Sequence, residues 1–324
     1  MNIALDRSKL SKFQSTIALL LLCVFLSILS DKFLTVDNGW NVLRQISVNI
    51  CISVGMTLVV LTAGIDLSVG SILAFSGAVA AGLLKSGISF PENDLFIGFT
   101  LLGTVLAGVA TGSFLGFFNG WVITKFKVPP FVATLAMLTV ARGFTMLWTK
   151  GYPISSLGTN FAYIGTGWFL GIPVLVWIAV FVIIAAMIIS NKTALGRYIY
   201  AIGGNENAAK LSGINIDKVK IIVYTLAGAL AAIGGIMVTS RLDSAQPNAG
   251  MSYELDAIAA VVIGGTSLSG GRGTIIGTVL GAIIIGVLNN GLVLLDVSPF
   301  WQQVVKGMVI LLAVMIDKAN SKAE

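Results

Sequence analysis

Long apolar stretches alternate with short polar segments along the chain. The apolar stretches lie at 16–30, 45–64, 70–84, 95–118, 129–148, 170–190, 219–239, 254–269, 274–295 and 300–316. A transmembrane helix needs roughly 20 such residues, with about 17 as a lower limit. The stretches are continuously apolar and do not alternate with a period of two, which excludes transmembrane β-strands. The pattern predicts an all-α integral membrane protein with about ten transmembrane helices, some of them broken by glycine, in one domain over residues 1–324.

The composition indicates the same class of protein. Apolar residues make up 56% and charged residues 10% of the 324 residues, whereas a soluble domain carries about 25% charged residues. So few charges do not cover the surface of a soluble protein, and the apolar surface is therefore expected to face lipid. The formal net charge is +6. Because no basic run is interleaved with aromatic residues, we attribute the excess to orientation in a membrane and expect no nucleic acid partner.

Lysine and arginine are unevenly distributed among the segments that connect the apolar stretches. With the N-terminus placed in the cytoplasm, thirteen lie in inner segments: Arg7, Lys9, Lys12, Lys125, Lys127, Lys192, Arg197, Lys210, Lys218, Lys220, Arg272, Lys318 and Lys322. Five lie in outer segments: Lys32, Arg44, Lys85, Lys150 and Arg241. Basic residues favour cytoplasmic loops. Both termini are therefore predicted to be cytoplasmic, with 191–218 as the largest inner loop.

The sequence lacks the motifs of several classes of protein. It contains no histidine and no GxxxxGK[ST] loop, so it has neither histidine chemistry nor a Walker site for ATP. Cys23 and Cys51 lie in apolar stretches without a CxxC pattern, and we interpret them as buried hydrophobic residues. Glu254 and Asp256 are expected to decorate the first turn of a helix. We therefore expect no catalytic site, metal site or cofactor.

Glycines recur every four residues in two of the predicted helices. They are Gly108, Gly112, Gly116 and Gly120 in one helix, and Gly273, Gly277 and Gly281 in the other. Because residues four apart share a helix face, each set forms a smooth ridge on which a second helix backbone packs closely. We interpret both ridges as packing surfaces without a chemical role.

Two glycine-interrupted stretches resemble each other. Residues 63–70 read AGIDLSVG and residues 264–271 read GGTSLSGG. Paired segments of this kind indicate an internal repeat and lie near the pathway of many transporters. The topology above places both on the inner side, which favours a parallel repeat. A second match, between Pro130-Phe131 and Pro299-Phe300, falls on opposite sides and contradicts it, so the symmetry stays open.

Asp66 is the acid in the more polar of these two stretches. A carboxylate among apolar residues is costly unless it has a partner or is hydrated. One interpretation is a group that lines or gates a pathway. The other is an N-cap for a helix that begins near Leu67, with Ser68 sharing that role. The two interpretations are compatible.

The inner loop contains a short polar helix pattern. Asn205 is a suitable N-cap, Glu206 suits the positive end of a helix, and Gly213 suits the position after its end. Ala208 and Leu211 would present a small apolar face to the cytoplasm. Because a solvated helix of this length is marginal by itself, the pattern indicates a surface that contacts a partner.

Three stretches of the chain carry a family resemblance. Residues 195–215, which begin Leu195-Gly196-Arg197-Tyr198, resemble the coupling loop of the permease subunits of binding-protein-dependent ABC sugar importers. Residues 55–70 and 244–273 are similar to the same family, so the resemblance covers nearly the whole chain. The importer-wide coupling pattern is matched in part: Glu206 with Ala208, Ala209 and Gly213 fit it, and its later Leu-Pro is absent.

The resemblance implies a transport subunit that hydrolyses no ATP itself. Its expected partners are a cytoplasmic ABC ATPase, a periplasmic sugar-binding protein, a second copy of the permease chain and the lipid of the bacterial inner membrane. The resemblance implies that the ATPase contacts the coupling helix, whose residues here are Asn205, Glu206, Ala208, Ala209, Leu211 and Gly213. The expected cargo is a monosaccharide, with ribose first.

Polar residues within the apolar stretches are candidates for the pathway. They are Asn49, Thr57, Asp66, Ser68, Asn119, Thr134, Asn289 and Asn290. For Asn289 and Asn290 the competing interpretation is a hydrogen bond between helices, since adjacent amides in lipid need partners. Arg142 lies within a predicted helix and is expected to reach outward or to pair with an acid. Arg44 and Arg241 are candidate contacts for the binding protein, with simple solvation as the alternative.

Two other functions fit parts of the pattern. The chain would belong to the same class if it carried another pentose, a hexose, a nucleoside or a signalling derivative of a sugar. A stand-alone secondary transporter belongs to a different class, and the scarcity of acids within the apolar stretches disfavours proton coupling. Genes for an ATPase and a binding protein beside this one would distinguish the two classes.

Overall fold

A computed structural model describes residues 7–90 and 95–322 of the chain, which are mainly helical. Seven of the described helices are long and apolar enough to cross a membrane: α2 (Val36–Leu61), α3 (Val69–Ser86), α4 (Leu101–Lys125), α5 (Pro130–Thr149), α7 (Val174–Lys192), α10 (Ile216–Arg241) and α12 (Ile275–Leu294). The prediction of an all-α membrane protein is therefore confirmed. The larger count of ten spans stays a prediction, and the ends of the chain lie outside the described residues.

Six further helices complete the described chain. They are α1 (Arg7–Leu29), α6 (Thr159–Thr166), α8 (Ala194–Gly204), α9 (Glu206–Leu211), α11 (Tyr253–Ile263) and α13 (Pro299–Lys322). The predicted span at 254–269 corresponds to α11, which has only 11 residues. It ends before Gly264-Gly265, where Gly265 takes a positive φ of 82° that a continuing helix does not allow.

Three short antiparallel strand pairs were not predicted from the sequence. They are β1 (Ile88–Phe90) with β2 (Leu95–Ile97), β3 (Ile154–Ser155) with β6 (Ser244–Ala245), and β4 (Trp168–Phe169) with β5 (Ile172–Pro173). The predicted span at 95–118 was wrong at its start, because residues 95–97 form β2 and α4 begins at Leu101. The N-cap Thr100 fixes this start, since its hydroxyl accepts the N–H of Gly103 at 3.2 Å.

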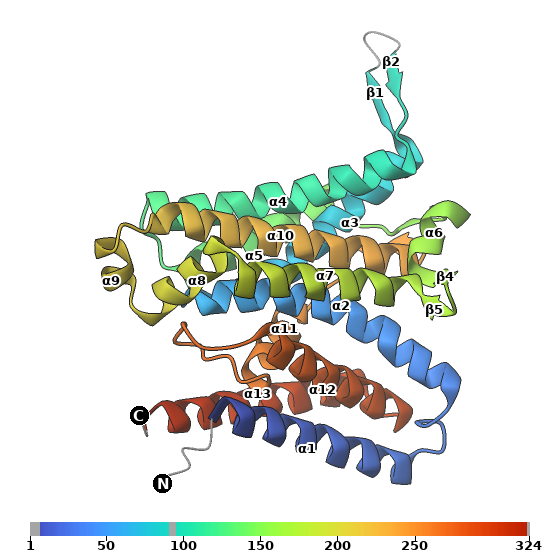
Figure 1. Ribbon diagram of the computed structural model, residues 1–324. Helices are drawn as coiled ribbons and strands as arrows, with labels where there is room; N and C mark the ends of the chain where they lie inside the picture. The colour runs from blue at the N-terminus through green and yellow to red at the C-terminus, as the bar shows by residue number, and fades with distance from the viewer. Residues whose placement is uncertain (1–6, 91–94, 323–324) are drawn as a thin grey trace. The chain divides into compact units, whose positions relative to one another are not determined.

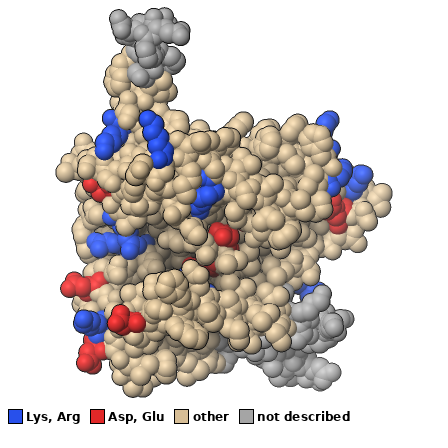
Figure 2. Space-filling view, turned by 180° about the vertical axis from the view of Figure 1, so that it is seen from behind, with Lys and Arg blue, Asp and Glu red and all other residues tan. Residues whose placement is uncertain are grey.

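The chain divides into two compact units. One holds the described residues up to Gly64 together with Ile183–Ile214 and the chain from Leu255 onward. The other holds Ile65–Val182 and Asn215–Glu254. On the face in Figure 2 most of the surface is uncharged, and charged side chains gather mainly toward its two sides. This distribution suits a protein whose apolar surface faces lipid.

The second unit is built around the contact between α4 and α10, which run alongside each other in Figure 1. The predicted ridge on α4 forms this contact. A Cβ at Gly112 would lie 2.5 Å from the carbonyl oxygen of Gly228 and 2.6 Å from the Ala232 side chain. At Gly120 it would lie 2.7 Å from the Ile221 Cα. The two backbones therefore touch in a way that only glycine permits.

The other predicted ridge packs in the first unit. A Cβ at Gly277 would collide with the carbonyl oxygen of Gly264, and one at Gly281 with that of Ala260. The ridge on α12 thus lies against α11, because the end of α11 and the following Gly264 pack on the first two turns of α12. The remaining member of the pattern, Gly273, lies before α12 with a φ of 152°.

The two similar stretches occupy comparable places in the chain. Each follows the end of a helix, α2 or α11, and precedes another, α3 or α12. Within the first unit they also meet, because a Cβ at Gly270 would lie 2.9 Å from the Ala63 side chain. Pro130 and Pro299 are both the first residues of helices, where the missing N–H of proline costs nothing.

The glycine seam between α4 and α10 yields a stability prediction. Gly112→Leu should destabilise the protein by more than the 1–3 kcal/mol or so that overpacking usually costs, because backbone atoms stand in the way. Ala110→Leu is the matched control, since Ala110 is exposed on the same helix. Unfolding temperature in detergent measures both. Equal unfolding temperatures for the two variants would contradict close packing at Gly112.

Candidate functional site

A buried polar cluster lies where α3 begins, in the second unit. The Asp66 carboxylate accepts the N–H of Ser68 at 2.9 Å and its hydroxyl at 2.5 Å through one oxygen, Oδ1. The Asn119 amide of α4 donates to the Ser68 hydroxyl at 2.9 Å. Thr134 of α5 donates to the Ile65 carbonyl oxygen at 3.2 Å. Three pathway candidates predicted from the sequence, Asp66, Ser68 and Asn119, are thus brought into one network.

The helix at this cluster starts two residues after the expected position near Leu67. α3 begins at Val69 with Ser68 as its N-cap, and the Ser68 side chain makes no capping hydrogen bond. Asp66 therefore precedes the cap position and holds the turn instead. Asp66 and Ser68 are both 0% exposed, so the network forms part of the packed interior of this unit.

Tyr224 of α10 belongs to the same region. It is the largest of the fully buried side chains, and it interacts electrostatically with Asp66. Within the described residues, the second Asp66 oxygen, Oδ2, and the Tyr224 hydroxyl are buried polar atoms without a hydrogen-bond partner. Uncompensated polar atoms of this kind are costly in an apolar interior. They make this cluster the most polar part of the contact between α3, α4 and α10.

A second polar cluster lies in the first unit, among α11, α12 and α13. The Lys306 ammonium is 3.0 Å from Asp256 Oδ2, and the Asn289 amide donates to the same oxygen at 3.3 Å. The Asp256 side chain is 4% exposed. Glu254 and Asp256 lie in the first turn of α11, as expected, but Asp256 is buried there. It needs a buried partner, and it has two.

The remaining pathway candidates of the first unit join helices. Asn290 exchanges two hydrogen bonds with Asn38 of α2, at 2.8 and 3.1 Å. The Thr57 and Thr278 hydroxyls lie 2.7 Å apart and connect α2 to α12. Asn49 is 7% exposed. The interpretation of Asn289 and Asn290 as amides that bond between helices is therefore confirmed, and a role for these residues in transport stays a prediction.

Arg142 does not reach outward. Its guanidinium donates to the carbonyl oxygens of Pro247 and Ala249 at 2.7 and 2.8 Å. Both acceptors belong to the non-helical segment that follows α10. Glu254 also attracts the Arg142 guanidinium electrostatically, and the expected pairing of Arg142 with an acid stays a prediction.

The predicted coupling helix is α9. The Asn205 side chain accepts the Ala208 N–H at 2.9 Å as an N-cap. At the other end the N–H groups of Gly213 and Ile214 donate to Lys210 and Ala209 at 3.0 and 3.1 Å, and Gly213 has a φ of 84°. These two bonds form a Schellman motif. Both predicted caps are confirmed.

The side chains of α9 divide into two sets. Ala209 is 4% exposed and faces the rest of the chain. Glu206 and Ala208 are exposed, and Leu211 is 90% exposed. The exposed residues of α9 are Glu206, Asn207, Ala208, Lys210 and Leu211, so its outward face carries charges of both signs beside an apolar side chain. The role of this exposed face as a contact surface stays a prediction.

α8, which precedes α9, packs closely on the rest of the first unit. A Cβ at Gly203 would collide with the Leu61 carbonyl oxygen and the Gly271 backbone nitrogen. The Tyr200 hydroxyl donates to the Gly273 carbonyl oxygen at 2.9 Å. Burial raises the pKa of Tyr200, so the phenol keeps the proton that it donates. The base of α9 is thus fixed to the end of α2 and to the loop before α12.

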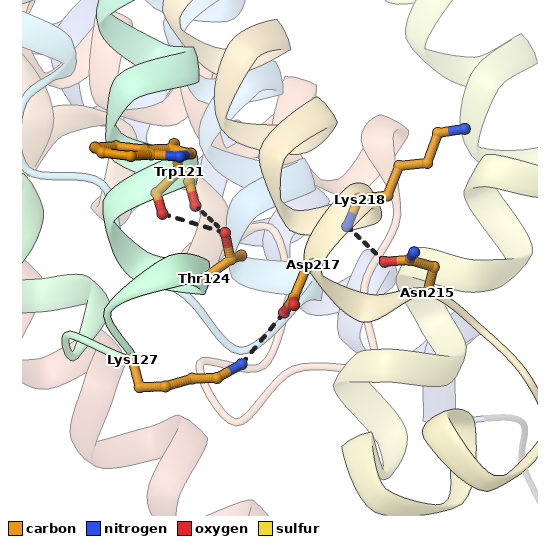
Figure 3. A network of polar contacts seen from close by, with 7 residues as sticks. Trp121, Thr124, Lys127, Asn215, Asp217 and Lys218 are labelled. Atoms are coloured by element: carbon orange, nitrogen blue, oxygen red, sulfur yellow. Dashed lines mark hydrogen bonds and ion pairs between the residues drawn. The ribbon is translucent and has the colours of Figure 1, made fainter.

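The chain after α9 enters α10 at an exposed polar corner of the second unit (Figure 3). Asn215 caps α10 by accepting the Lys218 N–H at 3.0 Å. Lys127, beyond the end of α4, points toward Asp217 at 3.4 Å. Both side chains are more than half exposed, so this ion pair contributes little to stability.

Comparison with known proteins places the chain in a family. Residues 39–314 match the family described as "Branched-chain amino acid transport system / permease component". The ribose import permease protein RbsC of Haemophilus influenzae is 51% identical over 308 residues, which cover 94% of this chain and 92% of the relative. That of Bacillus subtilis is 52% identical over 314 residues, covering 96% and 94%. The chain belongs to this permease family.

A more distant relative extends the range of named sugars. The galactose/methyl galactoside import permease protein MglC of Haemophilus influenzae is 38% identical over 329 residues, covering 97% of both chains. No solved structure shows a significant match to this permease. The sequence comparisons therefore identify the family, and the geometry above rests on the chain's own structure.

Sequence reasoning missed the Asp256–Lys306 pair of the permease. The signal was present, since both residues lie in apolar stretches where a lone charge is expensive. Asp256 was instead assigned to a helix start, and no role was assigned to Lys306. Because each charge is expensive by itself, the sequence could have suggested that the two charges pair. That pairing would have predicted the contact between α11 and α13. Arg44, the ninth residue of α2, and Arg241, the last residue of α10, are both partly buried, and their predicted role stays untested.

The buried ion pair can be tested by removing one charge. Lys306→Met should destabilise the permease by about 3 kcal/mol or more, because it leaves a carboxylate buried without its cation. The double variant Asp256→Asn with Lys306→Met should recover most of this loss, since no charge remains. Unfolding of detergent-solubilised protein measures both. A single variant as stable as the native chain would contradict the pair.

Proposed function

We propose that this permease is the transmembrane subunit of an ATP-driven ABC importer that carries ribose across the bacterial inner membrane. The observation that carries the proposal is the identity of 51–52%, over nearly the whole length, to permeases named for ribose import. Relatives named for xylose and galactose are 34–38% identical. Another sugar of similar size is therefore the second candidate.

The proposed energy source is a separate cytoplasmic ATPase that docks on α9. The exposed Glu206, Ala208 and Leu211 supply a charged and apolar contact on a helix that both caps hold in shape. Asn205 and Gly213 cap the two ends of α9, and the buried Ala209 supports its inner side. A periplasmic sugar-binding protein would deliver the sugar, with Arg44 and Arg241 as its candidate contacts, and a second copy of the permease would complete the pathway.

The proposed coupling runs from α9 into the membrane helices through α8. Gly203 touches the backbone of Leu61 and of Gly271, so a displacement of α8 presses directly on the end of α2 and on the loop before α12. Rigid contacts of this kind convert motion at one end of an element into motion at the other. The buried residues Asn49, Thr57, Asp66, Ser68, Asn119, Asn289 and Asn290 are proposed to meet the pathway in another state of this cycle.

The orientation follows from the charge distribution. α9 must face the cytoplasm to meet an ATPase, and the excess of lysine and arginine in the predicted inner segments favours the same side. Both termini are then cytoplasmic if the chain crosses the membrane ten times. Reaction of single cysteines in 191–218 with reagents that do not cross the membrane tests this orientation.

Glu206→Lys tests the docking surface. It should uncouple ATP hydrolysis from transport, because it reverses the charge on the exposed face of α9 and opposes the helix dipole. Insertion into the membrane should be unchanged. Lys192→Glu is the control, since it reverses an exposed charge in the same loop outside α9. Normal assembly with the ATPase and normal uptake by Glu206→Lys would mean that the docking helix lies elsewhere.

The sugar is tested by competition. The permease is reconstituted with its ATPase and sugar-binding protein, and uptake of labelled ribose is measured against unlabelled ribose, xylose and galactose. We expect ribose to compete at a concentration at least about tenfold lower than the other two, a difference of roughly 1.4 kcal/mol. Stronger competition by xylose or galactose would reassign the cargo within the family.

A further inference from the structure

The segment between α10 and α11 lies within the second unit, beside α3 and α5. α10 ends at Arg241 and α11 begins at Tyr253, so residues 242–252 contain no helix. A Cβ at Gly250 would lie 2.5 Å from the Gly70 carbonyl oxygen and 3.0 Å from the Leu73 side chain. The backbone of Leu73 in turn touches Gly235 of α10. The chain therefore leaves the end of α10 and turns back along it as far as Gly235.

This return places the segment at membrane depth. Gly235 is six residues before the end of α10, which is about 9 Å along the helix axis. The 26 residues of α10 span about 39 Å, against a hydrocarbon layer of about 30 Å. A point 9 Å from the helix end then lies roughly 5 Å inside the hydrocarbon layer. The position of Arg142 gives a similar depth. Arg142 lies seven residues before the last residue of α5, which is about 10 Å along the helix axis.

Specific bonds hold the segment in its irregular shape. Arg142 binds the carbonyl oxygens of Pro247 and Ala249, which lie outside the helices. The Ala249 N–H donates to the Gln246 carbonyl oxygen at 3.0 Å, and the Gln246 amide donates to the Ser244 hydroxyl at 3.1 Å. A guanidinium committed to two backbone carbonyls at this depth is an expensive arrangement. These bonds fix the backbone of residues 242–252. Side chains of this segment then lie at the surface of the unit.

Two side chains of the segment are exposed at this depth. Met251 is 61% exposed and Asn248 is also exposed. Irregular backbone does not occur facing lipid, and it is tolerated only where protein covers it or where it lines a water-filled cavity. α3 and α11 also both begin at this level, and broken helices that start within the bilayer surround the substrate in many transporters.

We propose that residues 246–252 line the sugar pathway and that the Asn248 amide hydrogen-bonds to sugar hydroxyls there. Arg142 is a positioning residue, since it acts through the backbone that carries Asn248. The exposed face belongs to water and sugar and not to lipid. The nature of the cargo rests on the proposed function, whereas the hydration of the segment does not.

Thiol labelling tests the proposal in the full importer in liposomes. Asn248→Cys is made after Cys23→Ser and Cys51→Ala, and a charged methanethiosulfonate that does not cross the membrane is added on both sides. Leu106→Cys is the matched control, because Leu106 is 59% exposed and lies five residues inside α4. We expect Asn248→Cys to react at least about tenfold faster than the control. Ribose with its binding protein and ATP should slow that reaction, and the modification should abolish uptake.

Three outcomes separate the explanations. Reaction no faster than that of Leu106→Cys would overturn the proposal. Disulfide formation between two copies of Asn248→Cys that shields the thiol from the reagent even without sugar would also overturn it, because a second copy would then cover the segment. Fast reaction combined with no ribose uptake by the native importer would support a hydrated segment and would reject ribose as the cargo.

The role of Arg142 has its own readout. Arg142→Met should change the labelling rate of Asn248→Cys several-fold, because the segment loses two hydrogen bonds, and Arg142→Lys should restore part of that rate. A general loss of stability would slow assembly of both variants without this graded effect on the thiol. An unchanged labelling rate in Arg142→Met would exclude the positioning role.

Discussion

Lipid offers no hydrogen bonds, and this constraint governs the permease at every level. Backbone groups are satisfied within helices, so the helices associate through close contact of smooth surfaces. The glycine seam between α4 and α10 and the contact of α12 with α11 are the results. The same constraint explains why buried polar side chains occur in groups. Asp66 accepts a hydrogen bond from Ser68, and Asp256 forms an ion pair with Lys306.

The constraint also separates packing from function in the permease. Where helices are continuous and packed along glycine seams, the backbone N–H and C=O groups bond within the helices and are not available to a sugar. Where helices break, at the start of α3 and in residues 242–252, carbonyl groups and amides become available at membrane depth. α9 lies outside this system: its caps hold its shape, and Ala209 packs against the rest of the chain. Gly203 and Tyr200 join it to the helices, so a force on α9 reaches them through backbone contacts.

Much of the fold could be predicted from the sequence because hydrophobicity and glycine spacing are local signals. The ridges at Gly112 and Gly277, and both caps of α9, follow from residue type and spacing. The strand β2 and the start of α3 at Val69 could not, because short apolar segments fit a strand or a helix and tertiary contacts decide between them. Long-range partners were also out of reach. Nothing near Arg142 in the sequence indicates that it binds carbonyl oxygens more than one hundred residues away.

The central claim is that this permease moves sugar only when an ATPase acts on it from outside the membrane. Proteoliposomes that contain the permease alone, or the permease with its ATPase and sugar-binding protein, separate this claim from secondary transport. We expect labelled ribose to accumulate only with both partners present and ATP supplied on the ATPase side. Accumulation by the permease alone, driven by an ion gradient without ATP, would contradict the claim.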